Sequence, residues 1–261
     1  MPAPPLRPLI HAHRGSSAAA PENTLAAFRL GLAQGADALE MDLQLTKDGA
    51  VVVIHDPTVD RVTDGHGRVA DLTLAEIQQL DAGTRFGPAF RGERIPTLEE
   101  VVELLKHKAG PTVRLNLELK YGAEPPADPA ALPRAVLAVL RQTGTLHRVF
   151  LQSFLHSVLP EVKLLASDVP LGLLMDRRQA VPDPVALARR YQADYYAPDY
   201  RAVTPALVTA LHAAGIPVVA WTVDGPSEVR RMLAAGIGGL AGDGIITNRP
   251  DRVRTIVGGG Q

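Results

Sequence analysis

The sequence predicts an α/β protein, a closed (β/α)8 TIM barrel with a capping insertion after the second barrel strand. Three observations lead to this prediction. The chain has 261 residues, a length typical of one such barrel, and 46% of them are hydrophobic, enough for a large core. Short apolar segments alternate with helical segments along most of the chain, which is typical of parallel sheets. Residues 57–96 interrupt this alternation and are too long for a simple barrel loop.

The predicted barrel domain covers residues 9–257 and follows a short proline-rich tail over residues 1–8, expected to be disordered. Its first strand is Leu9–His13. A helix then begins at Pro21-Glu22-Asn23-Thr24, where Asn23 or Thr24 is the expected N-cap, and ends near Gly35.

The second strand opens a hairpin around which the candidate site is organised. Successive residues of a strand point to opposite faces, so Glu40 and Asp42 share one face and the apolar residues between them share the other. The turn at Asp48-Gly49 is typical of a hairpin and returns the chain toward His55. One short stretch therefore brings two carboxylates and an imidazole to one place.

The rest of the chain supplies the remaining units of the barrel. Within the insertion, residues 72–77 form a short predicted helix with Thr73 as N-cap, and Thr97-Leu98-Glu99-Glu100 is typical of a capping box that opens a helix to about Lys108. The later predicted strands are 112–120, 148–153, 171–175, 194–197, 217–223 and 244–247. The helices predicted between and after them lie near 130–142, 156–166, 184–192, 205–214 and 226–235 and from 251 onward.

Composition excludes several classes of function. The formal net charge of −1 does not favour binding to nucleic acid or to an anionic membrane. The chain has no cysteine, which excludes disulfides, thiolate metal sites and a cysteine nucleophile. No apolar stretch approaches the roughly 20 residues that span a bilayer, and the start does not resemble a signal peptide. We expect a cytoplasmic protein without stable membrane insertion, compatible with a homo-oligomer.

Polar residues gather where the predicted strands end, which is the edge that carries the active site in such barrels. Glu40, Asp42 and Glu118 come from neighbouring strands and should converge. Unpaired, they would raise one another's pKa, and a hard divalent cation would relieve this conflict, with oxygen ligands favouring Mg2+ or Ca2+. Ion pairs with Arg14 or Lys120 would relieve it as well, and the sequence leaves both interpretations open.

Two of the eight histidines, His13 and His55, end strands beside the carboxylates. A pair of imidazoles can act as general base and general acid near neutral pH. His11 shares a face with His13 but lies deeper, so we expect it to be structural.

Other strand-end residues are candidates for substrate binding. Arg14, followed by Gly15, offers a fork for phosphate oxygens, and Lys120 adds a second charge; both could instead balance the carboxylates. Trp221, the only tryptophan, could form a wall of the pocket or pack in the core. Gln152 is a plausible hydrogen-bonding residue.

The order of these motifs resembles the glycerophosphodiester phosphodiesterase family. The motifs that carry this resemblance are His13-Arg14-Gly15, Pro21-Glu22-Asn23-Thr24, Glu40-x-Asp42, His55-Asp56, Glu118-x-Lys120, Gln152-Ser153-Phe154, Trp221-Thr222-Val223 and Ile245-Ile246-Thr247. Segments of the insertion match as well, at Arg61-Val62-Thr63, Gly65-His66-Gly67, Leu80-Asp81-Ala82-Gly83 and Ile95-Pro96-Thr97-Leu98. The resemblance covers the chain from His11 to Pro250 and departs from the family pattern at Asn248, where the family usually has Asp.

The resemblance implies a role for each of these positions. It implies a divalent-metal phosphodiesterase that hydrolyses glycerophosphodiesters to an alcohol and sn-glycerol 3-phosphate. The implied metal ligands are Glu40, Asp42 and Glu118; the acid/base pair is His13 and His55; and the substrate-binding residues are Arg14, Lys120, Gln152 and Trp221.

The resemblance leaves other points open. It does not say which histidine is the acid, or whether water or the glycerol 2-hydroxyl is the nucleophile. Two alternatives remain: a related lipid phosphodiesterase of phospholipase D or C type, and a non-catalytic phosphodiester-binding barrel.

Overall fold

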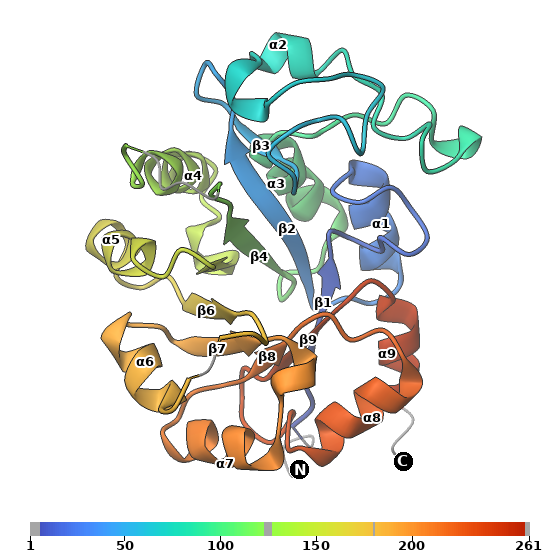
Figure 1. The fold of residues 1–261 in the computed structure, drawn as a ribbon. Coiled ribbons are helices and arrows are strands. Elements are labelled where there is room, and N and C mark those ends of the chain that lie inside the picture. Colours follow the sequence, from blue (N-terminus) through green and yellow to red (C-terminus); the bar gives the residue numbers. More distant parts are fainter. Residues whose placement is uncertain (1–5, 123–126, 180, 259–261) are drawn as a thin grey trace.

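The computed structural model describes residues 6–122, 127–179 and 181–258, which form a parallel barrel ringed by helices (Figure 1). Its strands follow one another around the barrel in the order β7-β6-β5-β4-β2-β1-β9-β8. Isolated parallel bridges from Tyr196 to Val218 and from Asp199 to Trp221 join the two ends of this order. The predicted (β/α)8 barrel is therefore confirmed. Its strands are β1 (Leu9–His13), β2 (Ala38–Leu45), β4 (Arg114–Leu119), β5 (Val149–Ser153), β6 (Leu171–Met175), β7 (Tyr195–Pro198), β8 (Val219–Ala220) and β9 (Gly244–Thr247).

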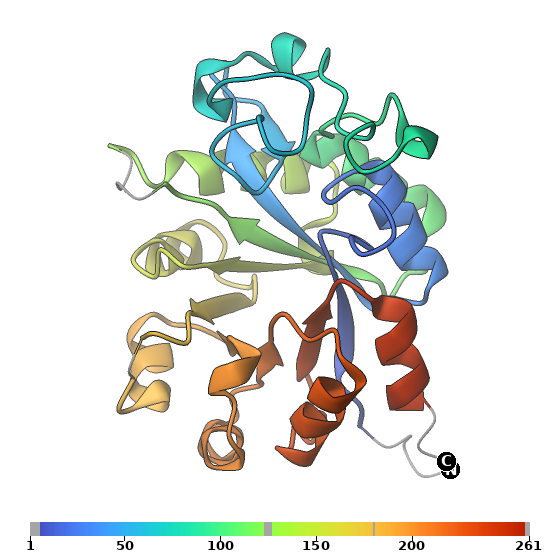
Figure 2. The ribbon, with the colours of Figure 1, turned by 45° about the vertical axis from the view of Figure 1, so that its right-hand side comes forward.

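Helices cover the outside of the barrel (Figure 2). Apolar side chains from both layers form the main core between them. Leu39, Met41 and Leu43 of β2 are fully buried in this core, so the alternate residues of β2 face the barrel interior. None of the helices in the described ranges is long and apolar enough to cross a membrane. The helices are α1 (Leu25–Ala33), α2 (Leu74–Ile77), α3 (Leu98–Lys108), α4 (Ala131–Gln142), α5 (Val158–Leu165), α6 (Pro184–Arg190), α7 (Pro205–Ala213), α8 (Pro226–Ala234) and α9 (Pro250–Gly258).

The insertion after β2 lies beyond the end of that strand (Figure 1). It follows β3 (Val51–Val53), which pairs antiparallel with β2 as the hairpin predicts. It includes the 3-10 turns at Val69–Asp71 and Pro88–Phe90 and the helix α2. Thr73 caps α2 and Thr97 opens α3 with a capping box, both as predicted, and the structure shows that Thr73 forms a capping box as well. A separate small core holds the insertion together: Val52, Ile54, Val59, Val69, Ile77, Ala82 and Ile95.

The structure differs from the predicted elements in two places. The strand predicted over residues 217–223 is reduced to β8, because the chain around it bonds β7 through single bridges rather than a continuous ladder. Near the N-terminus, part of the predicted tail lies outside the described residues, which begin at residue 6. Arg7 in that predicted tail forms a two-pronged ion pair with Asp37, 2.7 and 2.9 Å long, so packing begins before β1.

Candidate active site

Strand register brings the predicted site residues together at the carboxyl ends of neighbouring strands. His13 of β1 lies opposite Glu40 of β2. Asp42 of β2 lies opposite Glu118 of β4, and Glu118 lies opposite Gln152 of β5. Because residues opposite one another on adjacent strands share a face, these side chains all project to the same side of the sheet.

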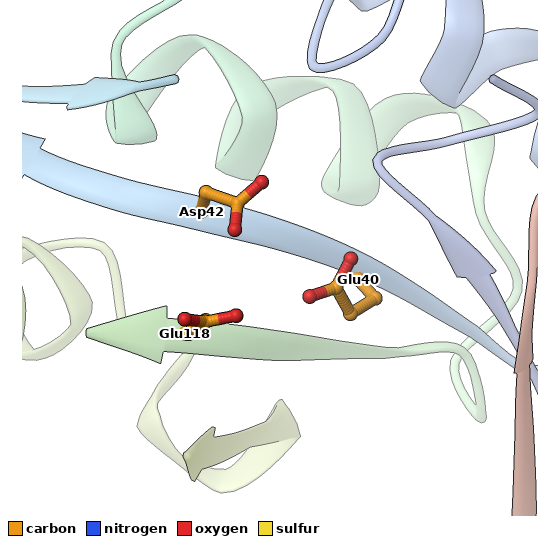
Figure 3. A group of neighbouring side chains, drawn as sticks. All are labelled: Glu40, Asp42 and Glu118. Carbon is orange, nitrogen blue, oxygen red and sulfur yellow. The ribbon is translucent and has the colours of Figure 1, made fainter. Parts of the chain in front are cut away.

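The predicted acidic cluster is present. Glu40, Asp42 and Glu118 each offer one carboxylate oxygen, and these oxygens all lie within 4.8 Å of one another (Figure 3). All three residues are buried, at 2%, 0% and 7% exposure. Burial and the neighbouring carboxylates raise the pKa of Glu40 well above its ordinary value. Burial also raises the pKa of Glu118, to about 7, although Lys120 opposes the shift.

Both predicted cations contact this cluster. Lys120 Nζ lies 2.7 Å from Glu118 Oε1 and 3.6 Å from Asp42 Oδ1. Arg14 Nε lies 3.1 Å from Asp42 Oδ2, without the alignment of a hydrogen bond. The backbone N–H of Arg14 donates to Glu40 Oε2 at 3.0 Å. Burial would raise the pKa of Asp42, but Arg14 and Lys120 outweigh it, so that pKa is lowered.

These ion pairs do not satisfy the cluster. Two cations face three carboxylates, and Asp42 Oδ1 is buried without a hydrogen-bond partner among the residues that the structure describes. A buried unsatisfied carboxylate oxygen is costly. The donor set of three carboxylates, with one orphaned oxygen among them, fits a hard divalent cation.

His13 is held from outside the cluster by residues after β8 and β9. Its Nδ1 lies 2.6 Å from Oδ1 of Asn248, and its Nε2 lies 4.0 Å from Glu40 Oε2. Asp224 accepts a 2.7 Å bond from Nδ2 of Asn248, which fixes the amide with its oxygen toward His13. Nδ1 of His13 therefore donates, and the lone pair of Nε2 points toward the cluster. Burial and Arg14 lower the pKa of His13 to about 4.

His55 is held by its neighbour in sequence. Its Nδ1 lies 2.7 Å from Oδ1 of Asp56, whose other oxygen accepts from Arg61 at 2.5 Å. The hydrogen bond from Arg61 lowers the pKa of Asp56 to about 2, so the carboxylate is ionised and accepts from Nδ1. Nε2 of His55 is thereby left unprotonated on the neutral ring, as in His13. Burial is the main cause that lowers the pKa of His55.

Gln152 and Trp221 take different places. Gln152 Nε2 lies 3.4 Å from Glu40 Oε1, so this residue contacts the acidic cluster directly. The Trp221 indole N–H donates to the Ala197 carbonyl at 2.8 Å, and its ring meets the edge of Phe154 with centroids 5.5 Å apart. Phe154 and Lys120 line a cavity of about 200 Å³ beside Glu118. A larger cavity, about 800 Å³, lies between α4 and α5 and includes none of the acidic cluster.

Sequence reasoning missed several residues that support the site. Asn23, considered as a helix cap, instead donates to Asp42 Oδ2 at 2.8 Å, while Thr24 caps α1. Asn248 stands out in the sequence only as a departure from the family pattern, and no local signal points to Asp224. The signals that identify the other two residues are the Pro-Glu-Asn-Thr motif for Asn23 and the position after Ile-Ile-Thr for Asn248. The predicted structural role of His11 fits its place: it is buried, and Nδ1 accepts from Asn116 at 3.1 Å.

Comparison with known proteins agrees with this arrangement. Residues 13–252 match the model of the glycerophosphoryl diester phosphodiesterase family. The chain belongs to this family. It is 40% identical over 252 residues to the glycerophosphodiester phosphodiesterase of Caldanaerobacter subterraneus subsp. tengcongensis. The aligned residues cover 97% of this chain and 98% of that relative. Members of the family are phosphoric diester hydrolases, so this chain is an enzyme of that class.

Solved structures of the family share the fold. An Oleispira antarctica phosphodiesterase in complex with the product sn-glycerol-3-phosphate superimposes with a TM-score of 0.84 at 30% identity, over 97% of each chain. A glycerophosphodiester phosphodiesterase from Agrobacterium tumefaciens superimposes with a TM-score of 0.76 at 30% identity, over 94% of this chain and 97% of the other. The predicted family resemblance is confirmed.

Proposed function

We propose that this member of the family hydrolyses glycerophosphodiesters to an alcohol and sn-glycerol 3-phosphate. The proposal includes a divalent cation, Mg2+ or Ca2+, and acid/base catalysis by His13 and His55. The observation that carries it is the acidic cluster with its orphaned Asp42 Oδ1, together with two imidazoles whose Nε2 atoms form no hydrogen bond within the described ranges. The product bound to the Oleispira enzyme supports the choice of glycerol phosphate.

Glu40, Asp42 and Glu118 would hold the cation. When bound, it supplies positive charge that stabilises the phosphoryl oxygens as negative charge grows on them. Arg14 adds to this charge: its Nη1 bonds Glu22 at 2.9 Å and its Nε faces Asp42, while Nη2 forms no hydrogen bond within the described ranges. Lys120 and Gln152 would contact the phosphate or glycerol, and Trp221 with Phe154 would bound the pocket.

The two histidines have different partners, and this assigns their roles in the proposal. A carboxylate, Asp56, accepts from His55, whereas a neutral amide, Asn248, accepts from His13. A carboxylate stabilises the protonated ring more than an amide does. We therefore assign His13 as the base that deprotonates the nucleophile, whether water or the glycerol 2-hydroxyl. His55, in its protonated form with a proton on Nε2, is then the acid that protonates the leaving alcohol.

A coupled assay tests the proposal. Glycerophosphocholine cleavage is followed with glycerol 3-phosphate dehydrogenase after EDTA treatment, and then after Mg2+ or Ca2+ is restored. We expect activity to disappear and return with the metal. Asp42→Asn should abolish both the activity and the rise in melting temperature that the metal causes, because ligand binding stabilises only the folded state. Glu103→Gln, an exposed carboxylate on α3, is the matched control.

Two other outcomes would contradict the proposal. Cleavage of lysophosphatidylcholine but not of glycerophosphocholine would indicate a lipid phosphodiesterase. Among the described residues of the insertion, Phe86 is the one exposed large apolar side chain, which does not favour a lipid surface. Binding of glycerol 3-phosphate without hydrolysis of any tested phosphodiester would indicate a binding protein.

A further inference from the structure

Arg61, a residue of the insertion, forms ion pairs with two carboxylates that belong to different loops of the barrel. Its Nε donates to Asp56 at 2.5 Å, and its two terminal nitrogens donate to the two oxygens of Glu22 at 2.8 Å each. Glu22 precedes α1, and Asp56 follows β3. All three guanidinium nitrogens therefore hold a carboxylate oxygen, so these two residues fix the orientation of the Arg61 side chain.

Each of these carboxylates also contacts a candidate active-site residue. The oxygen of Asp56 that Arg61 leaves free accepts from Nδ1 of His55 at 2.7 Å. Glu22 Oε1 accepts from Nη1 of Arg14 at 2.9 Å. Arg61 is thus one contact away from both the proposed acid and the proposed phosphate-binding cation.

We infer that Arg61 is a positioning residue: through Asp56 it orients His55, and through Glu22 it orients Arg14. The inference rests on the roles assigned to these two residues under the proposed function. The insertion then supplies a residue that orients two active-site side chains, in addition to covering one side of the barrel. A planar guanidinium is required, because only its fork can hold both oxygens of Glu22 while Nε holds Asp56.

The contribution of Arg61 to stability should be small. Its side chain is 48% exposed, and ion pairs that reach solvent contribute little to folding. The insertion has its own apolar core, which includes Val59 and Val69 and does not depend on Arg61. Loss of Arg61 should therefore affect catalysis far more than folding.

The chain offers a matched control. Arg85 also belongs to the insertion and lines the same groove of about 230 Å³ as Glu22 and Arg61. Arg85 is exposed, and no salt bridge found among the described residues involves it. Arg85→Ala removes the same charge from the same groove without releasing either carboxylate.

Kinetics and NMR together test the inference. We expect Arg61→Ala to lower kcat for glycerophosphocholine by about 10-fold or more, as loss of an orienting contact does at other sites. Arg61→Lys should recover only a small part, and Arg85→Ala should be close to the wild type. In a His55→Ala background, Arg61→Ala should lower kcat by a smaller factor than in the wild type, because the route through Asp56 is already gone and only the route through Glu22 remains. Melting temperatures of Arg61→Ala and Arg85→Ala should agree.

The ¹⁵N chemical shifts of the His55 ring provide a readout without catalysis. In the wild type we expect a protonated Nδ1, and in Arg61→Ala a mixture of the two tautomers. If the wild type has no activity, the proposed function is contradicted. The His55 chemical shifts can still be measured in that case, so the inference about Arg61 can be tested separately. Equal kcat for Arg61→Ala and Arg85→Ala, fully multiplicative effects with His55→Ala, or unchanged His55 shifts would each overturn the inference.

Discussion

The regions around His13 and His55 both orient an imidazole ring, but they do so with different hydrogen-bond acceptors. In both, an acceptor holds Nδ1 and leaves Nε2 free. His13 is 17% exposed and depends on a neutral amide, itself oriented by Asp224. His55 is 33% exposed and depends on a carboxylate, itself oriented by Arg61. Two identical side chains thereby acquire different affinities for a proton, which is what a base and an acid require.

Removing either imidazole should cause the largest loss of activity and tests whether the two histidines have different roles. We expect His13→Ala and His55→Ala each to lower kcat for glycerophosphocholine by about 10²–10⁴-fold. With glycerol 3-(4-nitrophenyl) phosphate, whose leaving group needs no proton, His55→Ala should recover most of its rate and His13→Ala should not. Steady-state assays of both esters measure this, with His107→Ala on the exposed face of α3 as control. Recovery of His13→Ala instead would reverse the assignment.

Changing the hydrogen-bond acceptor of either imidazole should cause a smaller loss of activity. Asp56→Asn gives His55 an amide acceptor like that of His13, so the ring should lose part of its capacity to donate a proton. We expect a loss of about 10-fold with glycerophosphocholine and little loss with the nitrophenyl ester. Asn248→Ala frees Nδ1 of His13 and should lower both rates by about 10-fold. Equal losses on both esters for Asp56→Asn would show that the carboxylate does not act through proton donation.

The pH dependence of stability should show the smallest effect and separate the two regions. The pKa of His13 lies at about 4 in the folded protein, below its ordinary 6.5, so the unfolded chain takes up this proton first. Stability should therefore fall as the pH drops from 6.5 to about 4. The pKa of Asp56 is depressed from 3.8 to about 2, so its contribution is present above 3.8 and is lost as the pH falls toward 2.

Urea unfolding in EDTA, repeated at a series of pH values, can measure the free energy of unfolding over these two pH ranges. The stability difference between the wild type and His13→Gln should shrink from about pH 6.5 to about pH 4. The difference between the wild type and Asp56→Asn should shrink mainly below pH 3.8, where Asp56 is protonated in the unfolded chain but not in the folded protein. If both differences shrink over the same range, the two regions do not differ as described.

Much of the fold and of the candidate site was predictable because the signals are local. The alternation of β2 placed Glu40 and Asp42 on one face, and the register with β4 then brings Glu118 opposite Asp42. Turn and cap residues such as Gly49 and Thr97 act within a few positions of themselves. The extent of β8 was not predictable, because the bonds around it depend on how the barrel closes against β7.

Local sequence patterns are enough to give the order of strands, the shared face of the carboxylates and the adjacency of His55 to Asp56. The residues that hold His13, in contrast, come together only in the folded barrel. Asn248 lies 235 positions away in the chain and reaches His13 because β9 pairs with β1. Arg61 likewise reaches Glu22 across 39 positions through the fold of the insertion. Periodicity acts over a few residues, whereas these partners meet only when the chain closes on itself, which no local pattern encodes.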